Sequence, residues 1–406
     1  MSSNTATATL GIDYDQRSRR RRRVALVGAL IILILVLLAL GWGVLKLLAP
    51  TGVPAAGTVP TGITWVRSTY GYGRDPAQQL YRPNAVAVGP DGSMWVTDPS
   101  QARILAFNPD GTFRTMIHQG PPSLKPGKLQ RPDAVAMTGN SVYVADYARN
   151  VVMQFTTGNQ FVREWYVPAP LGMAVKNGRI AVSTAFGVAL YDLRGKLLTL
   201  WGTRGSGPDQ FDLANGVAIA DDGTIYVSDT QNARVKAYTS SGKLLWISGG
   251  ATKAGSAGDA SQNTTGSASN PFQLPAGMTI DGRGRIVVVD PFNFTIDVLD
   301  PARKGAVVAK YGEFGGTDGM FAYPTGIAYD AKHDWFVVAD TDNDRAQVLR
   351  LPGSAASPLK AGIQRALLQP LWILLIPAVL VLSAGYYMLR RRRRWEYVEI
   401  PGPPGP

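Results

Sequence analysis

The stretch GVAIADDGTIYVSDTQNARVKAY, residues 216–238, contains the pattern that decides the fold. A small residue opens a short apolar run, a turn rich in Asp and Gly follows, and a second apolar run ends in Asp229. Nine residues after this aspartate, a third run ends at Tyr238. Short β-branched and aromatic runs separated by turn residues are typical of antiparallel strands. The stretch therefore predicts three consecutive strands joined by tight turns.

The pattern occurs six times between residues 63 and 351, at intervals of roughly 40–60 residues, the range of propeller blades. The first apolar runs begin at Ala85, Ala134, Gly172, Gly216, Gly277 and Gly326. Five of the second runs end in aspartate, at Asp98, Asp146, Asp229, Asp290 and Asp340. A fourth run follows in the first five copies. The sixth copy lacks it, but the run TWVRSTYG at 64–71 matches the fourth runs, so an N-terminal strand is predicted to close the ring.

These motifs resemble the NHL repeat family, whose pattern runs roughly Pro-x-Gly-Ile-Ala-Val-Asp, then Ile-Tyr-Val-Ala-Asp, then an Asn/Arg turn. Residues 216–238 are the best match, and the resemblance covers nearly the whole region between two apolar terminal segments. It implies an all-β, six-bladed β-propeller of a membrane-anchored bacterial type. It implies little about activity, because such propellers have many functions.

The two terminal segments predict membrane anchoring. Residues 24–48 hold one charge, Lys46, and 25 residues suffice to cross a bilayer core of about 30 Å. Residues 367–389 form the second predicted transmembrane helix, kinked at Pro377. The predicted order is therefore a basic N-terminus 1–23, helix 24–48, linker 49–62, propeller 63–351 with a flexible insertion 250–270, linker 352–366, helix 367–389 and a basic tail 390–406.

The distribution of charge predicts the orientation. Arg17, residues 19–23 and residues 390–394 form arginine clusters beside the apolar segments, which favours a cytoplasmic location for both termini. The propeller is then expected outside the cytoplasm of a two-pass protein in the cell membrane. Of 41 basic and 29 acidic residues, 27 and 25 fall in 61–353, so no basic face for nucleic acid is predicted.

A candidate ligand or partner face follows from the strand directions. The first strands of the blades begin on the face that carries the aspartate turns, which we expect to point away from the membrane. Polar residues just before these strands should ring the mouth of the central channel, where a small ligand or peptide would bind. They are Arg82, Asn84, Arg131, Asp133, Asn215, Tyr323 and Thr325.

The five repeated aspartates are interpreted as structural, because Asp in a tight turn accepts hydrogen bonds from backbone amides two residues on. Asp340, Asp342 and Asp344 superficially match a calcium loop, but Arg345 replaces the required Gly, so an ordinary turn is predicted. The third copy has Thr184 in place of the aspartate and a shorter turn, which predicts a notch where a partner could dock.

No catalytic residue, metal site or cofactor is predicted. The chain has no cysteine, and His118 and His333 lie on different blades, whereas the amidating lyases that resemble NHL propellers need a zinc-binding cluster of histidines. Gluconolactonase-like propellers need a channel glutamate, and Glu164 and Glu313 are placed in or beside outer strands. We therefore predict a non-enzymatic, membrane-anchored binding or scaffold protein. A ligand sensor that signals to a cytoplasmic partner is the alternative, and a metal-dependent lactonase or hydrolase is less favoured.

Overall fold

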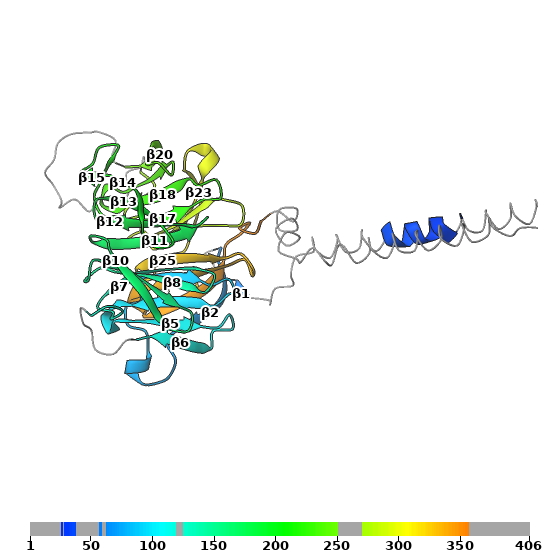
Figure 1. Ribbon diagram of the computed structural model, residues 1–406, viewed down its shortest axis with the longest axis horizontal. Helices are drawn as coiled ribbons and strands as arrows, with labels where there is room; N and C mark the ends of the chain where they lie inside the picture. Colours follow the sequence, from blue (N-terminus) through cyan, green and yellow to red (C-terminus); the bar gives the residue numbers. More distant parts are fainter. Residues whose placement is uncertain are drawn as a thin grey trace, which may run out of the picture. The chain divides into compact units, whose positions relative to one another are not determined.

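A computed structural model describes residues 26, 28–37, 57–58, 62–118, 125–250 and 270–356 of the chain. Residues 52–356 form one compact unit, and residues 1–51 with 357–406 form another. The first unit contains six antiparallel sheets arranged as blades, which confirms the predicted all-β, six-bladed propeller (Figure 1). Most of the predicted insertion at 250–270 lies outside the described residues.

The first three blades each have four strands in chain order from the axis outward. Blade 1 consists of β3 (Val86–Val88), β4 (Met94–Asp98), β5 (Arg103–Phe107) and β6 (Phe113–Ile117). Blade 2 consists of β7 (Pro132–Thr138), β8 (Ser141–Asp146), β9 (Val151–Thr156) and β10 (Phe161–Tyr166). Blade 3 consists of β11 (Pro170–Lys176), β12 (Arg179–Thr184), β13 (Gly187–Asp192) and β14 (Leu197–Trp201).

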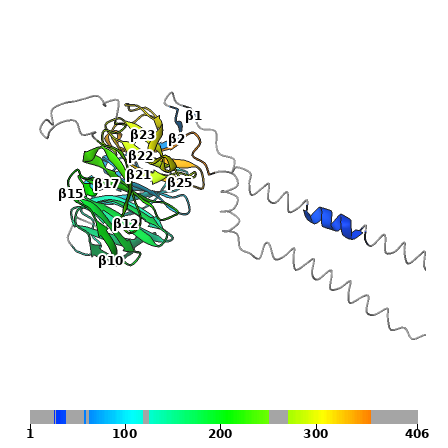
Figure 2. The same ribbon diagram turned by 90° about the horizontal axis from the view of Figure 1, so that it is seen from above.

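The last three blades repeat this order, and blade 6 takes its outer strands from the other end of the unit. Blade 4 consists of β17 (Ala214–Ile219), β18 (Ile225–Asp229), β19 (Arg234–Tyr238) and β20 (Leu244–Gly249). Blade 5 consists of β21 (Met278–Ile280), β22 (Ile286–Asp290), β23 (Thr295–Asp300) and β24 (Ala306–Tyr311), and Figure 2 shows β21, β22 and β23 side by side. Blade 6 consists of β25 (Pro324–Asp330), β26 (Trp335–Asp340), β27 (Arg345–Arg350), β2 (Thr64–Thr69) and β1 (Gly57–Thr58).

Short elements fill the connections between these strands. β15 (Thr203–Arg204) and β16 (Gln210–Phe211) form a parallel pair before blade 4. The 3-10 helices are η1 (Pro76–Gln78), η2 (Pro99–Gln101), η3 (Thr230–Asn232), η4 (Pro301–Arg303) and η5 (Thr341–Asn343).

The ring closes through the pairing of β2 with β27, as the sequence predicts. The two strands are antiparallel, with Thr64 opposite Arg350 and Thr69 opposite Ala346. Both ends of the propeller therefore lie on one face, which we call the terminal face. The opposite face carries the five turn aspartates, and we call it the aspartate face.

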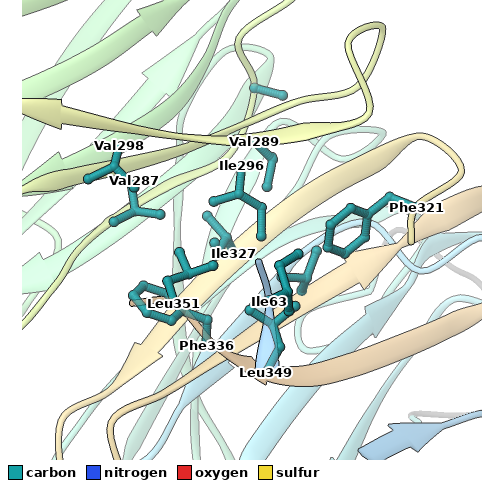
Figure 3. Packing of buried hydrophobic residues seen from close by; sticks show 12 residues of the cluster. Ile63, Val287, Val289, Ile296, Val298, Phe321, Ile327, Phe336, Leu349 and Leu351 are labelled. Atoms are coloured by element: carbon teal, nitrogen blue, oxygen red, sulfur yellow. The ribbon is translucent and has the colours of Figure 1, made fainter. Parts of the chain in front are cut away.

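Apolar side chains between neighbouring blades form the core. The second strands are buried along nearly their whole length because both of their surfaces pack against other blades, whereas β14 on the rim is half-exposed. Figure 3 shows one such cluster, in which Val287 and Val298 of blade 5 meet Phe336 and Leu349 of blade 6, and Ile63 joins them ahead of β2.

Glycine is required where the inner strands converge. A Cβ added to Gly172 would lie 1.9 Å from the Asn215 carbonyl oxygen, and one added to Gly216 would lie 2.1 Å from that of Ala276. A methyl group cannot fit at these distances without shifting the backbone of the next blade. The small residues that open the first runs therefore set the spacing of the blades at the axis.

The structure contradicts the two flanking transmembrane helices of the predicted fold class. No helix among the described residues is long and apolar enough to cross a membrane. In the first predicted span the structure describes residues 26 and 28–37, which are helical. The rest of that span and all of 367–389 lie outside the described residues.

Candidate functional site

The inner strands surround an axial channel with two cavities. The cavity toward the aspartate face measures 50 Å³, and the one toward the terminal face measures 260 Å³. Four of the seven predicted mouth residues line the smaller cavity: Asn84, Asp133, Asn215 and Thr325. Arg82, Arg131 and Tyr323 are not among its lining residues and lie in the loops that lead to the inner strands. Lys176 is the charged residue that lines the larger cavity.

The polar residues of the mouth connect neighbouring blades. The Asn84 amide nitrogen donates to the main-chain oxygen of Asp133 in blade 2, 2.8 Å away. The Thr325 hydroxyl of blade 6 donates to the main-chain oxygen of Asn84 at 2.7 Å. These bonds bridge the boundaries of blade 1 on both sides. The amide of Asn84 and the hydroxyl of Thr325 therefore hold the ring together at the site where a ligand was expected.

Asp133 is the acid at this mouth, and it is 3 % exposed. Burial raises the pKa of its carboxyl to about 6, although the guanidinium of Arg131 opposes the shift with an Nε–Oδ1 contact of 3.1 Å. The neighbouring carboxylate of Asp146 adds to the increase in pKa. Below pH 6 the mouth of the channel thus contains a neutral acid, and above it a carboxylate.

The other three predicted residues pair with side chains on the aspartate face. The guanidinium of Arg82 lies 2.8 Å from the Asp342 carboxylate, and its backbone N–H donates to Asp344 at 2.7 Å. Tyr323 meets the ring of Phe292 edge to face, with centroids 5.8 Å apart. These contacts place Arg82 and Tyr323 on the rim around the mouth.

The repeated aspartates are fully buried and hold the loops between blades. Asp146 accepts the backbone N–H of Gln130 at 2.6 Å and that of Arg131 at 3.1 Å, which fixes the loop that carries a predicted site residue. Asp290 and Asp340 likewise accept amides from the loops that precede their own inner strands, at Gln273 and Ala322. The expected partners were amides two residues on, whereas the observed loop amides lie 15–18 residues earlier in the chain.

We call the contact between a buried aspartate and its incoming loop the lock. In three blades an arginine extends this lock. The Arg234 Nε donates to Asp229 at 2.7 Å, and its terminal nitrogens reach the main-chain oxygens of Ser206, Gly207 and Gln210. Arg103 with Asp98 in blade 1, and Arg345 with Asp340 in blade 6, repeat the pair at 2.9 and 2.8 Å. Each buried carboxylate thus orients a guanidinium that holds the incoming loop.

Blade 3 lacks the lock, as its sequence indicates. Thr184 occupies the aspartate position and its hydroxyl lies 3.2 Å from the oxygen of Gly187. Only residues 167–169 connect β10 to β11, so blade 3 has little loop to hold. The turn presents Phe186, which is 41 % exposed, with the guanidinium of Arg204 5.2 Å from the ring centroid. At this turn, where the sequence predicts a notch, the structure places an aromatic side chain and an arginine on the surface.

The carboxylates of the calcium-like turn do not converge. Asp340 is used by Arg345 and Asn343, while Asp342 and Asp344 both contact Arg82. In the part of the chain that the structure describes, no group of three or more His, Asp or Glu residues could hold a metal ion.

Exposed aromatic residues on the aspartate face form the feature that sequence reasoning missed. Each ends or follows a fourth strand, lies in a loop between blades or stands at a turn between the second and third strands. The sequence contains a usable signal for them. An aromatic residue at a turn is not needed for the alternating pattern of a strand, so it is a candidate surface residue. The set, which we call the aromatic rim, comprises Tyr70, Tyr81, Tyr166, Phe186, Phe292 and Phe314.

Comparison with known proteins supports the repeat assignment. A model of the NHL repeat matches residues 211–238. NHL repeat-containing protein 3 of Mus musculus is 27 % identical over 248 residues, which cover 55 % of this chain and 65 % of that protein. The chain therefore spans less than two thirds of this relative's length.

Solved structures share the fold at low identity. A streptogramin B lyase structure aligns with a TM-score of 0.50 and 12 % identity, over 72 % of this chain and all of the other. A protein of unknown function from Bacteroides thetaiotaomicron aligns with a TM-score of 0.51 and 18 % identity, over 71 % of this chain and 75 % of the other. At such identities the likeness shows the fold and not the activity. The chain is a six-bladed β-propeller that carries the NHL repeat and is similar to NHL repeat-containing protein 3.

Proposed function

We propose that the chain is a non-enzymatic binding or scaffold protein that presents its aspartate face to a protein partner. The observation that carries the proposal is the aromatic rim. Tyr166, Phe314 and Phe292 are 71 %, 68 % and 54 % exposed, on one face of a domain whose other large side chains mostly fill the core.

The chemistry of the rim suits a protein partner. Aromatic and arginine side chains are enriched among the residues that dominate the energy of protein interfaces. Arginine lies beside aromatic rings at two places on this face, where Arg131 is 4.8 Å from the Tyr147 ring and Arg204 is 5.2 Å from the Phe186 ring. A partner that covers the rim would remove these rings from water. It would also meet the planar guanidinium groups of the neighbouring arginines, which can donate hydrogen bonds to it.

A non-enzymatic function is supported by the contacts that the mouth residues already make within the propeller. Asn84 and Thr325 bond to the neighbouring blades, and Arg131 is shared between Asp133 and the Tyr147 ring. Among the residues that the structure describes, these contacts engage the polar groups of the mouth within the protein, which favours a structural role for them over a catalytic one. The NHL repeat relative, moreover, is not named as an enzyme.

The location of this face is a second part of the proposal. We infer that the chain is attached to the cell membrane, with the propeller on the outer side. The support comes from the arginine clusters at residues 19–23 and 390–394, each next to an apolar segment, since such clusters favour the cytoplasmic side. Protease added to intact cells should degrade the propeller, and a propeller that stays intact until the cells are lysed would contradict this location.

Photo-crosslinking tests the binding face directly. A benzophenone amino acid at Phe292, on the aromatic rim, should trap a discrete protein partner in intact cells. The same group at Lys243, which is exposed on the terminal face, is the matched control and should not trap it. Combining Phe292 labelling with Tyr166→Ala should reduce the yield. Equal yields from Phe292 and Lys243 would refute the proposed face.

A further inference from the structure

Tyr143 in blade 2 and Tyr226 in blade 4 occupy equivalent positions of the repeat but differ in the hydrogen bonding of their hydroxyl groups. Each stands in a second strand opposite an inner-strand alanine, Ala136 and Ala218 respectively. Both are buried, with 1 % and 5 % exposure. The Tyr143 hydroxyl donates to the main-chain oxygen of Leu193 at 3.1 Å, whereas the Tyr226 hydroxyl has no hydrogen-bond partner among the described residues.

The cause is the turn of the following blade. In blade 3 the chain returns from Tyr191 to its register partner Leu197, and Leu193 within that turn reaches back to blade 2. In blade 5 the return from Leu299 to Val307 is two residues longer and contains η4. The longer turn leaves a 470 Å³ cavity on the terminal face, between blades 4 and 5. Tyr226 lines this cavity.

The other walls of the cavity are apolar on one side and acidic on another. Leu245, Trp246 and Pro301 supply the apolar wall, and the Trp246 ring lies 5.7 Å from that of Tyr226. Asp222 lines the rim, is exposed, and takes part in no ion pair among the described residues. Its neighbour Asp221 is already paired with Lys176 at 2.5 Å.

Burial and the nearby Asp222 carboxylate raise the pKa of Tyr226 to about 12. The phenol is therefore neutral at physiological pH and its oxygen can accept a hydrogen bond. Because Tyr226 lines the cavity and its hydroxyl makes no hydrogen bond among the described residues, that oxygen is free to pair with a ligand that enters the cavity. The site thus offers a carboxylate, a phenol oxygen and an apolar wall within one cavity, and no basic side chain lines it.

We propose that this cavity binds an aliphatic ammonium group, with its N–H donors on Asp222 and Tyr226 and its methylene chain against Leu245 and Trp246. An ammonium ion on an alkyl stem matches all three features, because it is cationic, donates several hydrogen bonds and buries apolar surface. The group can come from a small free amine or from a lysine side chain. This site lies on the terminal face and is independent of the aromatic rim.

Isothermal titration of the full-length protein with n-pentylammonium chloride tests the proposal. Saturable binding is expected in a range of about 0.1–10 mM, given the size of the ligand. The uncharged isostere 1-pentanol should bind at least about tenfold more weakly, as expected for a charge-assisted contact. Nα-acetyl-lysine methylamide in place of pentylammonium distinguishes a peptide lysine from a free amine as the natural source.

Substitutions identify the site. Asp222→Asn keeps the oxygen that accepts the Thr224 N–H and should weaken binding about tenfold, while Tyr226→Phe should weaken it about threefold. Asp91→Asn and Tyr143→Phe are the matched changes in blades 1 and 2 and should leave the affinity unchanged. Ala302→Leu, at an exposed position of η4, fills the cavity and should abolish binding even if Tyr226→Phe fails to fold. The proposal is overturned if pentylammonium shows no saturable binding, if pentanol binds equally well, or if Asp222→Asn and Ala302→Leu bind like the parent.

Discussion

Blades 3 and 4 are neighbours with the same four-strand order, but they hold their aspartate-face loops by different means. In blade 4 the buried Asp229 accepts the backbone N–H of Asp212 at 2.8 Å and pairs with Arg234 and Lys236. In blade 3 the corresponding residue is Thr184, and the connection from blade 2 is only 167–169. Of these two blades, the one with the longer connection is therefore the one that fixes it through a buried carboxylate.

At the axis the same two blades are alike. Gly172 donates its N–H to the hydroxyl of Ser183, which donates to the main-chain oxygen of Asn215 in the next blade. Gly216 and Ser228 repeat this arrangement toward Ala276. The repeat therefore preserves the contacts that set blade spacing and lets the aspartate-face connections vary. A partner can be recognised by those connections without disturbing the ring.

The largest difference between the two blades should be seen on removal of the lock. Asp229→Ala leaves Arg234 and the fully buried Lys236 without their carboxylate, which should lower the free energy of unfolding by about 3–5 kcal/mol. Thr184→Ala is the counterpart in blade 3 and should cost about 1 kcal/mol or less, since it removes one neutral hydrogen bond. Urea unfolding measures both values, and equal losses would contradict the comparison.

The axis should respond equally in both blades. Gly172→Ala and Gly216→Ala each place a methyl group against a carbonyl oxygen of the next blade, so each should cost about 1–3 kcal/mol through overpacking. The reverse change Ala134→Gly in blade 2 is the control and should cost only about 1 kcal/mol. A large cost at one glycine and none at the other would show that the axis is not uniform.

A third test moves a residue of blade 4 into blade 2. Asn215 stands where blade 2 has Asp133, and Asp133→Asn copies it. Because burial raises the pKa of Asp133 to about 6, the folded state binds a proton more tightly than the unfolded state. Stability from this group is present below the ordinary pKa of 3.8 and is lost as the pH rises through about 6. Asp133→Asn should therefore raise the free energy of unfolding by about 1–2 kcal/mol at pH 8 relative to its effect at pH 4.

Urea titrations of both proteins at the two pH values measure this shift. The test also bears on the channel mouth, because it shows whether the buried Asp133 carboxyl binds a proton more tightly than an ordinary aspartate does. An identical effect of Asp133→Asn at pH 4 and pH 8 would mean that the pKa of Asp133 is not raised.

The smallest effect on stability is expected at the exposed turn of blade 3. Phe186→Ala removes a half-exposed ring and its contact with Arg204, which should cost about 0.5 kcal/mol. If the aromatic rim binds a protein, the same change should reduce the crosslinking yield at Phe292. Thermal unfolding and crosslinking together check both statements, and an unchanged yield would remove blade 3 from the proposed interface.

The architecture was predictable because it depends on local pattern. The fixed interval between the turn aspartate and the end of the third strand predicts five equal hairpins, and the unpaired run at 64–71 predicts the closure that β2 and β27 form. Thr184 marks the exceptional blade in the same way. Two-residue periodicity and turn composition act over a few residues, so the sequence reveals them directly.

The contacts of the site were less predictable because they depend on distant parts of the chain. The partners of Asp146 lie in the preceding loop, and the free hydroxyl of Tyr226 depends on the length of a turn about 75 residues later. The terminal apolar segments predicted two membrane-spanning helices, but apolar length indicates only that a helix could span. The described residues contain no such helix.

Closure by β2 also imposes an order on biosynthesis. The strand at 64–69 is made before all four-stranded blades, but its partner at 345–350 is the last strand of the ring to be synthesised. Until then blade 6 presents an open edge, and a contact between such distant segments is slow to form. We therefore expect the seam of blade 6 to be the part of the propeller that stays unpaired longest, and an unpaired strand edge favours aggregation.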